Sequence, residues 1–200
     1  MGTRWSFTTS LVSVPDLQAA RETLLGEVRS HGLVIGRVTL SSGAEAEYYV
    51  DARRALLRPA AFRAAGELIA AAAADRGARA VGGPTMGAIP LACAAIAARS
   101  GDGLVGFFVR GARKEHGLQR WVEGPVEAGD SCLVVEDTVT SGGSVVAAIE
   151  RIREEGLEIA GTLCVVDRLA GGGEAIEAAG GGPFQALLTI DDVYPDRPDR

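Results

Sequence analysis

The sequence has little cysteine and no long hydrophobic stretch. Its three cysteines (Cys93, Cys132 and Cys164) are odd in number and widely spaced, which argues against a disulfide framework or a zinc site. No apolar run approaches the roughly 18 residues that identify a membrane-spanning helix, and the first residues lack the basic-then-apolar pattern of a signal peptide. We therefore expect a cytoplasmic protein that does not enter a membrane.

Lysine is also nearly absent, and the balance of charge is acidic. Of the 20 basic residues 19 are arginine, Lys114 is the only lysine, and the formal net charge is −6. A nucleic-acid binder is expected to have a basic face, so we expect no nucleic-acid partner. With 47% apolar and 23% charged residues, the 200-residue chain has the composition of a single folded domain over residues 1–200.

The most informative motif is LVVEDTVTSGGS at residues 133–144. Residues 133–135 form an apolar run typical of a strand that is buried on both faces of a parallel sheet. Two carboxylates, Glu136 and Asp137, come next, and a loop rich in glycine and hydroxyl groups leads into an amphipathic segment. The backbone amides of such a loop, together with the following helix N-terminus, form a cradle for a phosphate group.

The acidic pair distinguishes this loop from other phosphate-binding loops. No lysine stands where a Walker loop needs one, and the G-x-G-x-x-G pattern of a dinucleotide fold is absent. Carboxylates beside a phosphate cradle suit a ligand with a 5′-phosphate and vicinal ribose hydroxyls, and they attract hydrated Mg²⁺. The alternative is an ordinary strand-to-helix turn, but such a turn has no use for adjacent carboxylates at a buried strand.

The motif resembles the phosphoribosyl pyrophosphate (PRPP) motif of the type I phosphoribosyltransferases. The resemblance implies that Glu136 and Asp137 hold the ribose hydroxyls. It also implies that Mg²⁺ is held by PRPP itself and, through water, by Glu136 or Asp137. The remaining PRPP-binding residues would be those of the loop: Thr138, Val139, Thr140, Ser141, Gly142, Gly143 and Ser144.

Apolar periodicity predicts strands that alternate with helices. Strands are expected at 34–40, 48–51, 80–81, 104–109, 131–135, 159–166 and 184–190, and helices at 15–31, 59–74, 87–98, 142–155 and 174–179. This order indicates an α/β fold with a doubly wound, mostly parallel sheet, whose ligands bind at the carboxyl ends of the strands. We expect an N-terminal helix-and-hairpin hood at 1–55, a PRPP-binding core at 56–194 and a disordered tail at 195–200.

The early placement of this hood resembles the orotate branch of the family. TLSSGAEAEYYVD at residues 39–51 is similar to the family's T-L-x-S-G-x-x-S-x-Y-x-x-D segment. The resemblance implies that Tyr48, Tyr49 and Val50 shape the pocket for orotate, and that Arg53 or Arg54 reaches a phosphate. A plain amphipathic hairpin with surface arginines remains the alternative.

Two further segments resemble family loops that contact pyrophosphate. VGGPTMGAIP at residues 81–90 resembles the pyrophosphate loop, and VRGARKEHG at 109–117 resembles the catalytic loop R-K-x-x-K-x-H-G. The second match assigns catalytic and PRPP-binding roles to Arg110, Lys114 and His116. Lysines found in many family members are missing at Ser41, Gly87 and Gly111. The pyrophosphate loop would consist of Gly83, Pro84, Thr85, Met86 and Gly87.

The last matched segment is VVDRLAGG at residues 165–172. Its arginine, Arg168, matches the family residue that binds the carboxylate of orotate, and the planar guanidinium suits that partner. Thr140 matches the second orotate contact. Asp137, Arg110, Lys114 and His116 are the catalytic residues that the resemblance implies.

Together these matches imply an orotate phosphoribosyltransferase. Such an enzyme converts orotate and PRPP to orotidine 5′-monophosphate and pyrophosphate in pyrimidine biosynthesis, with Mg²⁺ as cofactor. The family also implies a homodimer with shared active sites. Two alternatives remain open at this point: a phosphoribosyltransferase for another base, and a non-catalytic regulator that senses PRPP.

Overall fold

The computed structural model describes residues 16–39, 45–99, 103–112 and 120–200. At its centre lies a six-stranded sheet in the order β5-β4-β3-β6-β7-β8, parallel except for the pairing of β4 with β5. Its strands are β3 (Ala80–Pro84), β4 (Val105–Val109), β5 (Val122–Glu123), β6 (Ser131–Val139), β7 (Glu158–Asp167) and β8 (Phe184–Thr189). The predicted α/β fold with a mostly parallel sheet is confirmed.

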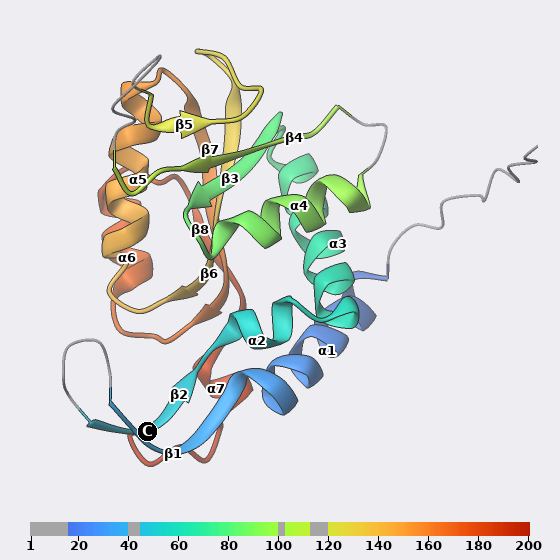
Figure 1. The fold of residues 1–200 in the computed structure, drawn as a ribbon, viewed down its shortest axis with the longest axis vertical. Coiled ribbons are helices and arrows are strands. Elements are labelled where there is room, and N and C mark those ends of the chain that lie inside the picture. The colour runs from blue at the N-terminus through green and yellow to red at the C-terminus, as the bar shows by residue number, and fades with distance from the viewer. Residues whose placement is uncertain (1–15, 40–44, 100–102, 113–119) are drawn as a thin grey trace, which may run out of the picture.

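Helices cover both faces of this sheet (Figure 1). One side carries α3 (Pro59–Asp75) and α4 (Ala88–Ala98), and the other carries α5 (Gly143–Glu154) and α6 (Gly172–Ala178). Alternate residues of β6 enter the two cores, because successive side chains of a strand point to opposite faces. Leu133 packs with the α3–α4 side, whereas Val134 packs with the α5–α6 side. This explains why residues 132–135 of the strand are all apolar.

The hood is built from the first described elements of the chain. It contains α1 (Leu17–Glu27), a π-helical turn at Val28–Gly32, the antiparallel hairpin of β1 (Leu33–Thr39) and β2 (Glu45–Val50), and α2 (Ala52–Leu56). Asp16 caps α1 by accepting hydrogen bonds from the amides of Gln18 and Ala19, both at 3.1 Å. No helix in the described part of the chain is long and apolar enough to cross a membrane.

Strand β6 is longer than the sequence predicted. It continues through the acidic pair to Val139, which pairs with Asp167 of β7, so the carboxylates belong to the strand and not to the following loop. The extension is possible because β7 runs alongside to Asp167, pairing Glu136 with Cys164 and Thr138 with Val166. Between the strands expected at 104–109 and 131–135, the structure also contains the short strand β5, which pairs with the end of β4.

The C-terminal segment differs from the predicted disordered tail. After α7 (Ile190–Val193), residues 194–200 fold back against the hood, and the C-terminus lies beside the β1–β2 hairpin (Figure 1). Arg197 forms ion pairs with Asp191 and Asp199, and its side chain is only 11% exposed. The polar sequence of the tail does not predict these contacts, because their partners come close to the tail only in the folded chain.

Candidate active site

A cavity of about 740 Å³ lies between the hood and the carboxyl ends of the strands. Open α/β sheets bind their ligands at this edge, and the volume lies within the range of small-molecule sites. It is formed by the hairpin, the start of α2, the turn after β3, the end of β6 with its loop and the start of α5, and the turn after β7. The lining residues are Val38, Thr39, Tyr49, Val50, Asp51, Arg53, Thr85, Met86, Gly87, Glu136, Asp137, Thr138, Thr140, Ser141, Ser144 and Arg168.

The acidic pair is fixed by hydrogen bonds from its own strand and from α5. The amide of Asp137 donates to Glu136 Oε1 at 3.1 Å, and the hydroxyl of Ser144 donates to Glu136 Oε2 at 3.1 Å. The amide of Thr138 donates to Asp137 Oδ1 at 2.9 Å. Both carboxylates are therefore oriented by groups of the protein itself.

Glu136 is buried, with 6% of its surface exposed. This burial raises the pKa of Glu136 from its ordinary value of 4.5 to about 8, and the neighbouring Asp137 carboxylate adds to the rise. The hydrogen bond from Ser144 works in the opposite direction. Glu136 therefore holds its proton at neutral pH, and an approaching cation would favour its release.

The carboxylates of Glu136 and Asp137 are the candidate ligands for a metal ion in this cavity. No group of three or more His, Cys, Asp or Glu residues that could hold a metal occurs among the residues that the structure describes. Mg²⁺ commonly binds through one or two carboxylates, water and substrate phosphates. Glu136 and Asp137 fit such a shared site, in which the substrate supplies most of the ligands.

The turn after β3 approaches the acidic pair very closely. A Cβ atom added at Gly87 would lie 2.5 Å from Asp137 Oδ1 and 2.6 Å from Glu136 Oε1. The carboxylates therefore occupy the space into which a side chain at this position would project. Gly83 and Pro84, predicted for the same loop, are buried inside β3 and do not line the cavity, whereas Thr85, Met86 and Gly87 do. The peptide bond between Thr85 and Met86 is cis.

The loop after the acidic pair divides between the cavity and the core. The side chains of Thr138, Thr140, Ser141 and Ser144 line the cavity. Val139 instead packs into the core on the α5–α6 side. The loop ends at Gly142, whose φ of +78° is a conformation that favours glycine, and α5 begins at Gly143. These two glycines can offer a ligand only their backbone.

The hood supplies charged residues that sequence reasoning only partly anticipated. Arg53 Nε lies 3.5 Å from Asp137 Oδ2 and 3.3 Å from Asp51 Oδ1. Of the two arginines considered, Arg53 lines the cavity and Arg54 does not. Asp51 was missed as a site residue, although the matched Y-x-x-D segment contained it. Val38 gave no sequence signal, because the pairing of the hairpin alone brings it to the cavity.

Arg168 enters the cavity from the turn after β7. Its amide donates to the carbonyl oxygen of Val139 at 2.9 Å, which ties this turn to the end of β6. The adjacent Asp167 accepts from the amide of Leu169 at 2.9 Å. Within the described residues, no carboxylate lies within ion-pair distance of Arg168. A half-buried guanidinium of this kind suits an anionic ligand.

Comparisons with known proteins identify the family. Residues 53–179 match the phosphoribosyl transferase domain. The orotate phosphoribosyltransferase of Streptomyces avermitilis is 47% identical over 178 residues, which cover 88% of this chain and 98% of that protein. The chain belongs to the orotate phosphoribosyltransferase family. The corresponding protein of Corynebacterium glutamicum is 45% identical over 174 residues, covering 87% and 94% of the two chains.

Solved structures of the family have the same fold. The orotate phosphoribosyltransferase of Mycobacterium tuberculosis H37Rv, in complex with PRPP, has a TM-score of 0.74 and 39% identity over 87% of this chain and 98% of that one. The same enzyme in complex with Fe(III) dicitrate has a TM-score of 0.79 and 43% identity, covering 88% and 99%. The family prediction and the predicted hood over an α/β core are confirmed.

The predicted catalytic loop is only partly described. Lys114 and His116 lie outside the described residues. Arg110 does not line the cavity: its Nη1 lies 3.4 Å from Glu123 Oε1, and its carbonyl oxygen accepts a hydrogen bond from Arg151 at 2.8 Å. The sequence thus predicted cavity residues in the hairpin and α2, in the turn after β3, in β6 with its loop and in the turn after β7. The roles assigned to them, including those of Lys114 and His116, stay predictions.

Proposed function

We propose that the cavity beneath the hood transfers the phosphoribosyl group of PRPP to orotate, yielding orotidine 5′-monophosphate and pyrophosphate. The observation that carries this proposal is the meeting of the acidic pair, the hydroxyl-rich loop and Arg168 in one cavity, in a chain of the orotate phosphoribosyltransferase family. The two alternatives, another base or a regulator without activity, have no comparable support.

The PRPP end of the cavity would be formed by β6 and its loop. Amides and hydroxyls of residues 138–144 suit the 5′-phosphate, because the loop leads into the N-terminus of α5. The oriented carboxylates of Glu136 and Asp137 suit the two ribose hydroxyls. The turn at residues 85–87 lines the cavity next to the acidic pair, so it suits the pyrophosphate group.

The orotate end would lie between the hood and the turn after β7. Arg168 provides a planar cation for the carboxylate of orotate, and the loop residue Thr140 lies in the same cavity. Tyr49 and Val50 of β2 form the wall that would face the flat pyrimidine. This arrangement would present the ring nitrogen to the anomeric carbon of PRPP.

The reaction needs charge stabilisation more than a nucleophile. Displacement at the anomeric carbon places negative charge on the departing pyrophosphate and positive charge on the sugar. We assign the first to Lys114, Arg110 and His116 and the second to Glu136 and Asp137. Mg²⁺, bound mainly by PRPP and shared with Glu136 or Asp137 through water, would neutralise pyrophosphate charge. Each well-placed donor is worth about 3–4 kcal/mol in the transition state.

We further propose that the enzyme acts as a homodimer in the cytoplasm and that the loop beginning at Arg110 serves the active site of the partner subunit. The position of Arg110 beside Glu123, away from the cavity of its own subunit, supports this arrangement. An arginine that begins a catalytic loop would otherwise be expected to face the PRPP site of the same chain.

The test is the loss of the near-ultraviolet absorbance of orotate on mixing the protein with PRPP and Mg²⁺. We expect absorbance to fall only when all components are present, and chelation of the metal with EDTA to stop the reaction. Parallel assays with adenine, hypoxanthine and uracil measure the choice of base. Faster turnover of a purine, or no turnover of any base, would overturn the proposal.

A further inference from the structure

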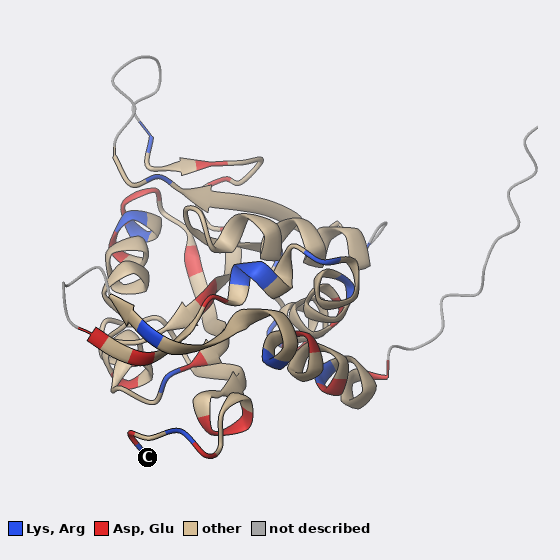
Figure 2. Cartoon of the chain, turned by 60° about the horizontal axis from the view of Figure 1, so that its bottom comes forward, with Lys and Arg blue, Asp and Glu red and all other residues tan. Residues whose placement is uncertain are grey.

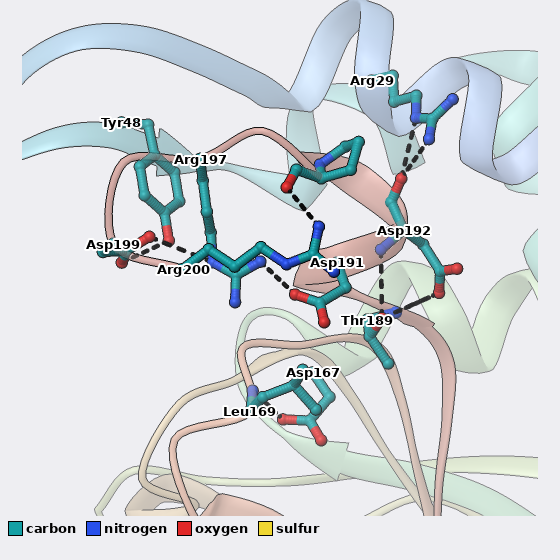
Figure 3. A network of polar contacts seen from close by, with 11 residues as sticks. Arg29, Tyr48, Asp167, Leu169, Thr189, Asp191, Asp192, Arg197, Asp199 and Arg200 are labelled. Carbon is teal, nitrogen blue, oxygen red and sulfur yellow. Dashed lines mark hydrogen bonds and ion pairs between the residues drawn. The ribbon is translucent and has the colours of Figure 1, made fainter.

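The C-terminal tail is linked to the hood by a chain of polar contacts (Figure 3). Asp191 of α7 holds Arg197, whose Nε lies 3.2 Å from Asp199 Oδ1. The other oxygen of the same carboxylate, Oδ2, accepts a hydrogen bond from the hydroxyl of Tyr48 at 3.0 Å. Tyr48 of β2 and Asp199 of the tail thus contact each other although they are 151 positions apart in the sequence.

Tyr48 is enclosed between this tail and the candidate orotate site. Its side chain is 5% exposed and does not line the cavity. The ring of Tyr194 meets the ring of Tyr48 edge to face, with centroids 5.4 Å apart. On another side, the guanidinium carbon of Arg168 lies 5.8 Å from the centre of the Tyr48 ring, within the range of a cation–π contact.

The protonation state of Tyr48 agrees with this geometry. Burial raises the pKa of the Tyr48 phenol above its ordinary value of 10.0; Arg168 opposes the rise and Asp199 adds to it. The phenol therefore keeps its proton near neutral pH and donates it to Asp199. With the hydroxyl fixed in this way, the ring has one orientation relative to Arg168.

We propose that Tyr48 and Asp199 are positioning residues that hold the Arg168 guanidinium in place for the carboxylate of the base. Tyr48 supports the guanidinium through its ring, and Asp199 holds Tyr48 through the phenol. The inference rests on the proposed function, in which Arg168 binds the carboxylate of orotate. It gives the C-terminal tail a part in base recognition, although no tail residue lines the cavity.

Three variants separate this role from general support of the fold. Tyr48→Phe keeps the ring and removes the hydroxyl, Asp199→Ala removes the acceptor, and Asp199→Asn keeps an oxygen that can accept the bond. Asp196→Ala is the matched control, because Asp196 is an exposed carboxylate of the same tail. Thermal unfolding of each purified variant checks that the fold is retained.

The readout is the Michaelis constant for each substrate. We expect Tyr48→Phe and Asp199→Ala each to raise KM for orotate about two- to tenfold, the effect of losing one hydrogen bond, and to leave KM for PRPP unchanged. The double variant should resemble either single variant, because both changes break the same bond. Asp199→Asn should restore most of the affinity, and Asp196→Ala should behave as the wild type.

Different failures have different meanings. If the wild type consumes orotate while the variants keep its KM for orotate, the positioning role is wrong and the proposed function stands. Equal rises in KM for orotate and PRPP would show a general structural effect and would also overturn the inference. A wild type that does not consume orotate would overturn the proposed function and this inference together.

Discussion

Glu136 and Asp137 are adjacent in sequence but lie in different surroundings. Glu136 is buried and receives the hydroxyl of Ser144, whereas Asp137 faces the guanidinium of Arg53 across the cavity. A protonated Glu136 lowers the negative charge of the acidic pair, since two ionised carboxylates side by side repel each other. Because Glu136 binds its proton more tightly in the folded chain than in the unfolded chain, the free energy of unfolding should depend on pH.

The first prediction concerns this pH dependence. Because the pKa of Glu136 is about 8 in the folded state against 4.5 as its ordinary value, the unfolded chain loses this proton first as pH rises. Between about pH 4.5 and 8 the free energy of unfolding should therefore fall, by at most about 1.4 kcal/mol per pH unit. Glu136→Gln, which is neutral at every pH, should remove that fall.

Urea unfolding of the ligand-free wild type and of Glu136→Gln at pH 5, 6, 7 and 8 measures the effect. The quantity to compare is the difference between the two free energies of unfolding at each pH, since other titrating groups affect both proteins alike. A difference that does not change between pH 5 and 8 would mean that Glu136 has an ordinary pKa.

The second prediction concerns Arg168. Arg168→Ala should raise KM for orotate about ten- to a hundredfold, because the loss of one charged hydrogen-bond partner costs about 1.5–3 kcal/mol. KM for PRPP should change far less. Arg153→Ala is a matched control, because Arg153 is an exposed arginine of α5 that hydrogen-bonds backbone carbonyls away from the cavity. Equal effects on both substrates would make Arg168 a structural residue.

At the scale of elements, sequence patterns predicted the order of the strands and helices well, and their ends less well. The apolar run at 133–135 located β6 because burial on both faces leaves a continuous signal. Its continuation to Val139 gave no such signal, since polar residues in a strand look like a loop until a long partner strand is known. The same limit applies to β5, whose two residues are a strand only through pairing with β4.

Contacts between distant segments were the part of the site that the sequence did not predict. Motifs identified the acidic pair and Arg168, because each stands at the end of an apolar strand. The ion pair of Arg53 with Asp137 and the bond of Tyr48 with Asp199 depend on how the hood lies over the sheet. No local pattern encodes that arrangement, and the tail was for this reason expected to be disordered.

The third prediction concerns the turn between β3 and α4. Gly87→Ala should displace the acidic pair, because the added Cβ would lie 2.5 Å from Asp137 Oδ1. Overpacking of this kind costs about 1–3 kcal/mol, so we expect lower stability and a KM for PRPP raised about tenfold or more.

Gly26→Ala provides the control for this experiment. Gly26 is an exposed residue of α1, and a Cβ added there meets nothing within 4 Å. Alanine should stabilise the helix by up to about 1 kcal/mol and leave both Michaelis constants unchanged. If Gly87→Ala behaves in the same way as Gly26→Ala, the close approach of the carboxylates has no functional consequence.

At the scale of the whole molecule, charged residues of both signs are spread over the described part of the chain. Basic and acidic residues are interspersed over the ribbon in Figure 2. The only lysine, Lys114, belongs to the loop that follows Arg110, whereas the acidic pair lies at the end of β6. If that loop serves the partner subunit, one active site takes its cationic and acidic groups from two chains.

The last prediction tests this shared site by mixing two inactive variants. Lys114→Ala should remove the charge that stabilises the departing pyrophosphate, and Asp137→Asn should remove the carboxylate that holds the ribose, so each homodimer should be inactive. In a heterodimer one site combines both changes and the other has neither. Random assortment of equal amounts makes half of the dimers heterodimers with one intact site each, so about a quarter of all sites should recover.

The two variants should be co-expressed with different affinity tags, so that heterodimers can be purified and their orotate consumption measured. Each variant expressed alone under the same conditions gives the background. Recovery in the heterodimer fraction requires that Lys114 and Asp137 of one site come from different subunits, because within one subunit no pairing of these variants restores both. Purified heterodimers without activity would place Lys114 in the site of its own chain, and a monomeric protein would exclude sharing altogether.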